Sequence, residues 1–303
     1  MTRSATLPFA VACLGIALFT GMDAAMKGLS IALGAYSAML FRQVIGVAIA
    51  APVYLLSPGG WPSRAGMRFH LMRGAVGAAM AVSWFYGLAR VPMAEAIALS
   101  FIAPLIALYL AAVILSERIG REAVVASLLG VAGVVVLLAA RWQADTGERH
   151  LDGIAAILAS AVLYAWNIIL MRQQALVARP AEVAFFQNLV SGGWLWLALP
   201  IVLIVRPTLF AVPVGGQWAL LALAAALTVV SLFLLSWAYG RAEAQVLVPV
   251  EYTAFLWLAI LGAVFYGEAV TLTTLGGAAL IVTGSLIAAR RAHVAGKGLE
   301  VGG

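Results

Sequence analysis

The amino-acid sequence predicts an all-α integral membrane protein whose ten transmembrane helices form two inverted five-helix repeats. Three observations support this fold class. Of the 303 residues, 64% are hydrophobic and only 10% are charged, whereas soluble domains are typically about 45–50% apolar and about 25% charged. The apolar residues form ten segments of roughly the 20 residues that cross a bilayer. The two halves of the chain also resemble each other.

The composition excludes several classes of protein. A cytosolic enzyme, a secreted domain or a nucleic-acid-binding protein could not cover this much apolar surface with so few polar groups. We interpret the net charge of +6 as the cytoplasmic excess of Lys and Arg that membrane proteins carry. The lone Cys13 forms no intrachain disulfide. His70, His150 and His293 lie in or beside polar connections, so we expect no histidine base or histidine-bound metal within the membrane.

The expected spans follow one another with short breaks. The first span follows Arg3, and we interpret it as a helix that stays in the protein, because it has no convincing cleavage site. A Pro- and Gly-rich turn ends the second span, Pro92 precedes the fourth, and the eighth begins after Pro213. The ten spans are expected at residues 7–28, 36–56, 69–89, 93–115, 122–140, 152–171, 181–205, 216–239, 244–266 and 271–289.

The polar connections predict the boundary between the repeats and the orientation of the chain. The longest connection, Arg141 to Asp152, divides the chain into a first repeat at 1–145 and a second repeat at 146–303. Placing the N-terminus in the cytoplasm puts twelve Lys and Arg residues inside and six outside or at the outer helix ends. The positive-inside rule then predicts that both termini are cytoplasmic, and we expect the membrane to be a bacterial inner membrane.

The two repeats share a sequence pattern. Residues 104–117 align with residues 255–268, and each is an apolar helix that ends in a small residue and a glutamate, Glu117 or Glu268. Near the fronts of the halves, Lys27 matches Arg172. Five helices per repeat force the second repeat to run inverted in the bilayer, as in secondary transporters, which bind substrate near the midplane between such repeats. The helix that comes after each of these two segments carries glycines that we expect to lie against other helices: Gly130, Gly133, Gly276, Gly277 and Gly284.

These features resemble the drug/metabolite transporter superfamily, specifically its ten-helix EamA-type branch. The resemblance covers residues 5–291 and rests on the two repeats, on Glu117 and Glu268, on the Met22–Lys27 stretch and on the Pro249–Thr253 opening of the ninth helix. It implies a membrane transporter. Members of this superfamily include exporters of amino acids and carriers of nucleotide-derived or other small metabolites. The motifs are short, so they identify the superfamily and not the substrate.

The sequence has no enzyme motif. It lacks the zinc-binding His-Glu-x-x-His pattern, a Walker loop and a Gly-x-Ser-x-Gly nucleophile turn. We therefore expect no catalytic residue, no metal and no cofactor. A gradient-driven carrier needs only a cavity with two accessible states and different contacts in each.

Glu251 is the most informative candidate for the binding site, because ionisable residues within spans are costly and usually functional or paired. It lies early in the ninth span, just after Pro249, which removes a backbone donor. The functional interpretation is that Glu251 binds a substrate amine or carries a proton, which would make the proton the coupling ion. The alternative is a structural partner for a basic or hydroxyl group on a neighbouring helix.

Four further charged residues are expected to form ion pairs or a gate. Asp23 and Lys27 lie four residues apart and share one helix face, so they are placed to pair within the helix, and Arg42 can join them. Direct contact with substrate is the alternative role of this group. Glu95 lies in the first turn of the fourth helix, where a carboxylate complements the helix dipole. We interpret Glu117 and Glu268 as features at the membrane interfaces.

Polar amides and aromatic rings complete the candidate binding site. Asn167, Gln187 and Asn188 fall within spans, where amides need partners, and they either bind substrate or hold helices together. Deep aromatic residues near polar groups suit a flat apolar group or a cation over a ring face. The alternative for each ring is core packing or lipid contact. The aromatic candidates are Trp84, Phe85, Tyr86, Phe101, Tyr164, Trp166, Tyr252 and Trp257.

The leading functional hypothesis is a secondary transporter that exports an amino acid or another amine-bearing metabolite across the cytoplasmic membrane. Its partners are then a small-molecule substrate, the lipid bilayer and no nucleic acid. The first alternative is an uptake or exchange carrier for another solute, such as a nucleotide-derived metabolite. The second alternative is a non-transporting membrane enzyme or scaffold, which the inverted repeat and the missing catalytic motifs disfavour.

Overall fold

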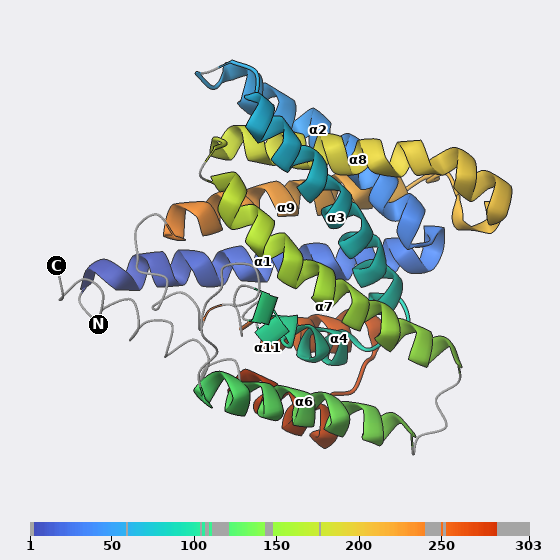
Figure 1. The fold of residues 1–303 in the computed structure, drawn as a ribbon. Coiled ribbons are helices and arrows are strands. Elements are labelled where there is room, and N and C mark those ends of the chain that lie inside the picture. Colours follow the sequence, from blue (N-terminus) through green and yellow to red (C-terminus); the bar gives the residue numbers. More distant parts are fainter. Residues whose placement is uncertain are drawn as a thin grey trace.

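The computed structural model describes residues 3–58, 60–103, 105–106, 109–110, 121–142, 148–175, 177–239, 250 and 253–283. Every regular element in these residues is a helix (Figure 1). The helices are α1 (Arg3–Leu33), α2 (Ala35–Leu56), α3 (Arg64–Leu88), α4 (Met93–Ser100), α6 (Arg121–Trp142), α7 (Glu148–Ala175), α8 (Pro180–Val205), the short 3-10 helix η1 (Pro207–Leu209), α9 (Gln217–Tyr239), α11 (Thr253–Tyr266) and an unlabelled helix, Leu272–Thr283. The predicted helical class therefore holds throughout the described chain.

Five of the described helices are long and apolar enough to cross a bilayer, at Leu7–Leu33, Ala35–Leu56, His150–Met171, Ala181–Val205 and Gln217–Leu235. Several helices extend beyond the predicted spans, because a helix continues into polar residues where an apolar segment stops. The fourth span differs most from its prediction. There α4 ends at Ser100 and a turn follows at Phe101 and Ile102, just ahead of Pro104 in the sequence. The chain is helical again at Ala103, and Pro104 follows it in the sequence; proline is tolerated in the first turn of a helix but not in its interior, where it removes a backbone hydrogen bond.

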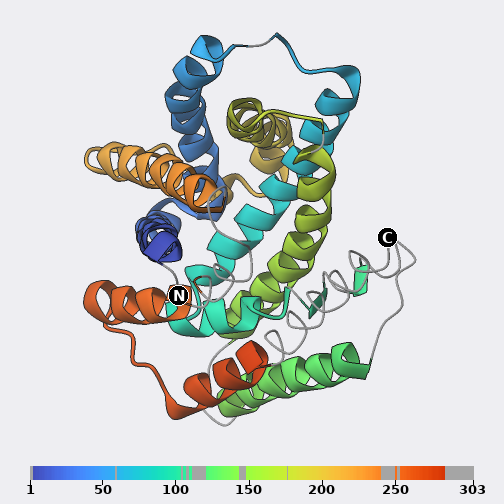
Figure 2. The same cartoon turned by 90° about the vertical axis from the view of Figure 1, so that its left-hand side faces the viewer.

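The helices pack mainly across the two halves of the chain. Helix α1 lies along α9, and α3 lies along α7 (Figures 1 and 2). Helix α2 packs on α8 and α9, while α8 also packs on α3. Helix α4 contacts α7 and α11, and α11 contacts α1. Helices α1 and α9 are the first and eighth predicted spans, and α7 and α3 are the sixth and third. Each span of one repeat corresponds to the span five places away in the other repeat. The pair of α1 and α9 therefore corresponds to the pair of α7 and α3, and exchanging the repeats reproduces the packing pattern.

Turn chemistry ties the start of α2 to the second half of the chain. Gly34 has φ +79°, a left-handed conformation that glycine adopts without a Cβ clash, and it lets α2 begin one residue after α1 ends. Ser37 donates to the Leu209 carbonyl at 3.1 Å and accepts from the Ala211 N–H at 2.9 Å. These two bonds hold α2 against the connection between α8 and α9.

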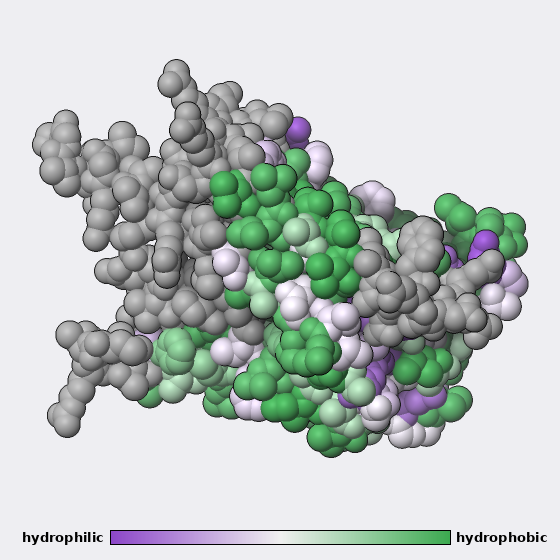
Figure 3. Space-filling view, turned by 90° about the horizontal axis from the view of Figure 1, so that it is seen from below, coloured by the Kyte–Doolittle hydropathy of each residue, from purple (hydrophilic) through white to green (hydrophobic). Residues whose placement is uncertain are grey.

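The surface of the described chain is apolar, as a lipid environment requires. Large hydrophobic side chains such as Leu56, Ile204 and Leu272 are more than four-fifths exposed (86%, 83% and 86%). Figure 3 shows apolar side chains gathered over the described part of one face. The fully buried core includes Met26, Leu40 and Leu99. Contact of this apolar surface with water would be unfavourable, so the bilayer is the solvent of these helices.

Glycines bring α6 against the helix Leu272–Thr283, which lies beside it in Figure 2. A Cβ on Gly133 would lie 2.6 Å from the Gly277 carbonyl oxygen, and one on Gly277 would lie 2.9 Å from the Gly133 carbonyl oxygen. A Cβ on Gly130 would lie 2.3 Å from Leu105. The packing prediction is therefore right for these three. It is wrong for Gly276, which has no described atom within 4 Å of its Cβ position, and Gly284 lies outside the described residues.

Candidate functional site

A buried carboxylate on α1 and a buried guanidinium on α2 form the centre of the candidate site, which we call the Asp23 site. Asp23 is 4% exposed, and its Oδ1 accepts a hydrogen bond from Trp84 Nε1 of α3 at 3.1 Å. Arg42 is 9% exposed and donates from Nη1 to Thr228 Oγ1 of α9 at 3.0 Å. Four helices from both halves of the chain thus contribute one polar group each.

The two charges of the Asp23 site are close without being paired. The Arg42 guanidinium acts electrostatically on the Asp23 carboxylate, yet within the described chain no ion pair joins them, and the buried Arg42 Nε has no hydrogen-bond partner. A buried charge without a full set of partners is costly. This arrangement leaves a donor and an acceptor of opposite charge available to a ligand that carries both an amine and an acid.

Lys27 pairs with Glu268 and not with Asp23, so the predicted pair within α1 is wrong. The Lys27 ammonium contacts the Glu268 carboxylate and donates to the Val91 carbonyl at 2.8 Å. The second Glu268 oxygen accepts from the Met93 N–H at 2.7 Å. We call these groups the Lys27 gate. A carboxylate at the first N–H groups of α4 accepts a hydrogen bond from a donor that has no partner within the helix, and it complements the helix dipole. This explains why the Glu268 carboxylate lies at the start of α4, where Lys27 contacts it.

Two glycines and a tyrosine place Glu268 in the gate. Gly267 has φ +63° and ends α11, so the chain turns back toward the bundle. Gly262 leaves room for the carboxylate, because a Cβ there would lie 2.5 Å from Glu268 Oε2. The Tyr266 hydroxyl donates to the Ala24 carbonyl at 2.6 Å, and its ring centre lies 5.3 Å from the Lys27 nitrogen. Glu268, which we interpret from the sequence as a feature at a membrane interface, therefore has defined partners in the bundle, and its side chain is 17% exposed.

Glu95 and His150 lie near the same end of α7. Glu95 is 1% exposed in the first turn of α4, the place the sequence predicts for it. His150, in the first turn of α7, brings its Nε2 to 3.4 Å from the Glu95 carboxylate. This contact joins the two halves of the chain at the start of α7.

A second polar cluster lies where α3 begins and α7 ends, and we call it the His70 cluster. Its members come from α3, α7 and α8. His70 Nε2 lies 2.8 Å from Glu182 Oε1, and its Nδ1 lies 2.8 Å from Gln174 Nε2. Arg73 donates to Gln174 Oε1 at 2.5 Å and to Asn167 Oδ1 at 3.2 Å. His70 is fully buried among these helices, although in the sequence it lies in or beside a polar connection.

The sequence does carry a signal for the His70 cluster. His70 and Arg73 are three residues apart on α3, and Asn167 and Gln174 are seven apart on α7, which in each case places both side chains on one helix face. Interpreting the histidine as part of a polar connection hid this pattern. The same stretch begins with Ser63, which caps α3 by accepting from the Gly66 N–H at 3.0 Å.

Gln187 and Asn188 pack between helices. Gln187 donates to Ser191 Oγ at 3.0 Å within α8, and its nitrogen lies 2.5 Å from where a Gly77 Cβ would be. Asn188 donates to the Ala184 carbonyl at 2.9 Å and faces Gly46 of α2 in the same close manner. The buried Gln187 Oε1 has no hydrogen-bond partner among the described residues. These contacts favour the helix-holding role for both amides.

The remaining predicted residues are dispersed. The Arg90 guanidinium lies 3.4 Å from the ring centre of Tyr86, at the end of α3. Phe101 is buried at the end of α4, and Tyr164 is 42% exposed. Glu251 and Tyr252 lie outside the described residues. The described structure therefore brings Trp84 to the charged candidates and leaves Tyr86, Phe101 and Tyr164 apart from them.

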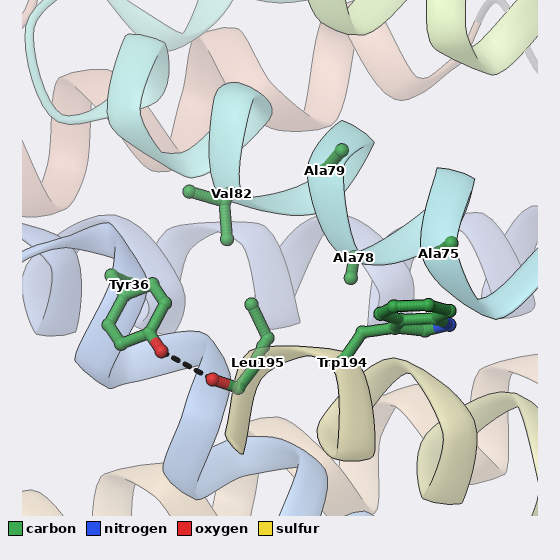
Figure 4. Close-up of a pocket in the computed structure, with 7 residues that line it drawn as sticks. All are labelled: Tyr36, Ala75, Ala78, Ala79, Val82, Trp194 and Leu195. Carbon is green, nitrogen blue, oxygen red and sulfur yellow. Dashed lines mark hydrogen bonds between the residues drawn. The ribbon is translucent and has the colours of Figure 1, made fainter. Parts of the chain in front are cut away.

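An apolar groove lies between α2, α3 and α8, apart from both charged clusters (Figure 4). It has a volume of about 270 Å³ and is lined by Tyr36, Ala75, Ala78, Ala79, Val82, Trp194 and Leu195. The Tyr36 hydroxyl donates to the Leu195 carbonyl, and Trp194 donates to the Leu71 carbonyl at 3.2 Å. The lining offers no charged group to a ligand.

Comparison with known proteins assigns the chain to a family. The profile of the EamA-like transporter family matches it twice, at residues 7–139 and 151–290. The chain belongs to the EamA-like transporter family. This confirms the predicted ten-helix membrane fold with two repeats and a multi-pass protein of the bacterial inner membrane. The predicted boundary at 145/146 lies in a stretch, 143–147, that is outside the described residues.

Several transporters are similar over most of the EamA-like chain. The pseudopaline exporter CntI of Pseudomonas aeruginosa is 27% identical over 90% of this chain and 92% of its own length. A riboflavin transporter of Rhizobium johnstonii is 31% identical over 73% of this chain and 70% of its own. An S-adenosylmethionine uptake transporter of Rickettsia bellii is 27% identical over 72% and 70%. A crystal structure at 24% identity shares the fold with a TM-score of 0.59, covering 94% of this chain and 97% of that one.

Proposed function

We propose that this EamA-like protein is a secondary transporter that exports an amino acid or a similar amine-bearing metabolite by alternating access. The observation that carries the proposal is the Asp23 site, which holds a buried carboxylate and a buried guanidinium with no ion pair between them in the described chain. The similarity to the pseudopaline exporter along almost the whole of both chains supports export as the direction.

The charges of the Asp23 site match those of a zwitterion. The Asp23 carboxylate attracts a substrate ammonium, and the Arg42 guanidinium attracts a substrate carboxylate with its free Nε–H. Trp84, whose indole N–H holds Asp23 in place, offers a ring face beside the ammonium position. Asp23, Arg42 and Trp84 belong to the first repeat and Thr228 belongs to the second, so a movement of the repeats changes the contact between Arg42 and Thr228. Binding can then differ between the two states, as alternating access requires.

The Lys27 gate closes one end of this bundle. Lys27 is only four residues beyond Asp23 on α1, so the gate lies about one helical turn, roughly 5.4 Å along the axis, from the carboxylate. The gate joins α1, α4 and the turn after α11. In the proposed cycle it separates when this end opens and forms again when the end closes.

Uptake or exchange of another solute is the second candidate function. The names of the Rhizobium and Rickettsia relatives, a riboflavin transporter and an S-adenosylmethionine uptake transporter, favour it. Riboflavin is a flat ring system, so a carrier for such a solute would depend on aromatic rings more than on the charge pair. A solute panel in proteoliposomes therefore separates the two candidates.

The test is counterflow of labelled amino acids, amines, nucleosides and riboflavin into proteoliposomes that contain the purified protein. We expect counterflow of an amino acid or amine, and we expect Asp23→Asn to abolish it, because Asn keeps the acceptor for Trp84 but loses the charge. Asp152→Asn is the matched control, since Asp152 is exposed at the start of α7. Counterflow of riboflavin or nucleosides alone, or an unchanged rate for Asp23→Asn, would overturn the proposal.

A further inference from the structure

The His70 cluster lies at the opposite end of α3 from the Lys27 gate. From His70 to the end of α3 at Leu88 there are 18 residues, or about 27 Å at 1.5 Å per residue. The cluster is buried: Gln174 is 1%, Glu182 4% and Asn167 7% exposed. The family assignment and the Asp23 site leave these side chains without a role, although a buried titratable group in a membrane helix is usually functional.

The hydrogen bonds of the His70 cluster define where the protons are. A guanidinium only donates, so the oxygen of Gln174 faces Arg73, at 2.5 Å. The Gln174 nitrogen therefore faces His70 Nδ1, at 2.8 Å. An amide nitrogen also only donates, so Nδ1 accepts and His70 carries its proton on Nε2. That proton is donated to Glu182 Oε1, at 2.8 Å. His70 is thus neutral in this conformation.

A second proton on His70 is incompatible with this arrangement. An Nδ1–H group would face the N–H group of Gln174, and two donors repel each other. Gln174 would have to turn its oxygen toward His70, and its nitrogen would then face the donating group of Arg73. Protonation of His70 therefore requires that Arg73 and Gln174 separate. Arg73 lies on α3 and Gln174 on α7, which belong to different repeats, and in a rocking cycle one repeat moves against the other.

We propose that His70, together with Glu182, is a proton-binding site that couples the movement of the repeats to a proton gradient, with Arg73 and Gln174 holding it unprotonated in this conformation. This inference rests on the proposed transport function. The lock, which is the hydrogen bond between Arg73 and Gln174, opens when the end of α7 that carries Gln174 moves away from α3 while Glu182 of α8 stays beside His70. A proton from the aqueous phase on one side of the membrane then binds Nδ1, and the imidazolium forms an ion pair with Glu182. When the lock forms again, the same proton leaves Nδ1 for the aqueous phase on the other side.

The surroundings of His70 fit this role. Arg179, which precedes α8, lies 3.6 Å from the second Glu182 oxygen and is 38% exposed, so the carboxylate connects the buried ring to the surface. The Phe186 ring of α8 stacks on His70 at 4.9 Å and shields it from other partners. On α7, Asn167 is the second acceptor of the Arg73 guanidinium, at 3.2 Å. Arg73 therefore keeps a partner when Gln174 turns.

The test measures proton binding without any solute, so it does not depend on knowing the substrate. Proteoliposomes with the full-length protein on a solid-supported membrane are switched from pH 8 to pH 6, and the transient charge displacement is recorded. We expect a displacement in the wild type and its loss in His70→Gln. His150→Gln is the matched control, because its ring meets Glu95 at 3.4 Å with 12% of the side chain exposed. We expect it to keep the signal.

A second variant covers the case in which His70→Gln does not fold. Gln174→Met removes the donor that faces Nδ1, so His70 should bind its proton more readily. The pH of half-maximal displacement should rise by about one unit, a tenfold gain in proton affinity. A purely structural histidine would lower thermal stability in either variant without moving this midpoint.

The outcomes separate this inference from the proposed function. No displacement in the wild type, an unchanged displacement in His70→Gln, its loss in His150→Gln, or an unmoved midpoint in Gln174→Met would each overturn the proton site. Amino-acid counterflow needs no proton gradient, so the wild-type protein is measured in both assays. Counterflow that is present while the displacement is absent refutes only the proton site, and a displacement without amino-acid counterflow refutes only the substrate assignment.

Discussion

Glu268→Gln should open the Lys27 gate. The substitution keeps an acceptor for the Met93 N–H but removes the negative charge that Lys27 contacts, and the Lys27 side chain is only 5% exposed. Removing one partner of a buried ion pair costs about 3–5 kcal/mol, because the other charge stays buried alone. Glu268 is 17% exposed and Gln still offers a dipole, so we take the lower limit, about 3 kcal/mol.

This free energy acts on the closed state of the gate alone. At 1.4 kcal/mol for each factor of ten, about 3 kcal/mol shifts the ratio of open to closed gates by roughly a hundredfold. The gate can be observed with a buried cysteine. Val91 is 1% exposed, and its backbone carbonyl, which bonds Lys27, survives substitution. In a Cys13→Ser background, Val91→Cys should react with maleimide roughly a hundred times faster when Glu268→Gln is added.

The double variant Lys27→Met with Glu268→Gln is the control. It removes both charges, so no lone charge remains buried, and the labelling rate of the cysteine at 91 should fall back toward that of the closed protein. If Glu268→Gln leaves the labelling rate and the thermal stability unchanged, the ion pair does not stabilise the closed end, and the gate in the proposed cycle is refuted.

Three further predictions concern packing, the predicted site and topology. Gly133→Leu should lower the yield and the melting temperature of folded protein, measured by fluorescence-detected size exclusion, because overpacking costs about 1–3 kcal/mol; Gly276→Leu, at a position with open space, should not, and equal effects would contradict the packing account. Glu251→Gln should keep the fold and stop or strongly slow solute counterflow, whereas wild-type rates across pH at normal stability would leave Glu251 without a functional role. A reporter fused after Gly303 should be active only if it works in the cytoplasm, and a signal restricted to the periplasm would reverse the orientation.

The helices could be predicted from the sequence wherever the length of an apolar segment determines where a helix begins and ends. The helices α1, α2, α8 and α9 match predicted spans closely because about 20 apolar residues in a row permit little else in a bilayer. The end of α4 at Ser100 does not follow, since the apolar run continues past Phe101. Apolar length also cannot show which helices pair, because lipid-facing and buried positions are equally apolar.

The candidate site was predictable in its residue types and not in its partners. Asp23, Lys27 and Arg42 are notable in the sequence as charges within spans, and all three are buried. Spacing along one helix favours a pair between Asp23 and Lys27, but Glu268, which is 241 residues from Lys27 in the chain, takes that place. Long-range partners of this kind depend on tertiary packing. The sequence did contain one signal for this partner, the small residue that precedes the glutamate in each repeat. In the second repeat that residue is Gly267, which makes the turn that places Glu268.

The distance in sequence between Lys27 and Glu268 has a consequence for how the protein is made. The first helix enters the membrane long before its ion-pair partner exists, because 241 residues separate the two. At about 5–20 residues per second, synthesis of that stretch takes roughly 10–50 s. During this time α1 holds an ammonium group in or near lipid without Glu268, and α9, its main packing partner, is also missing. The nascent chain therefore needs a temporary aqueous or proteinaceous shelter for Lys27, and slow translation of the second half prolongs that need.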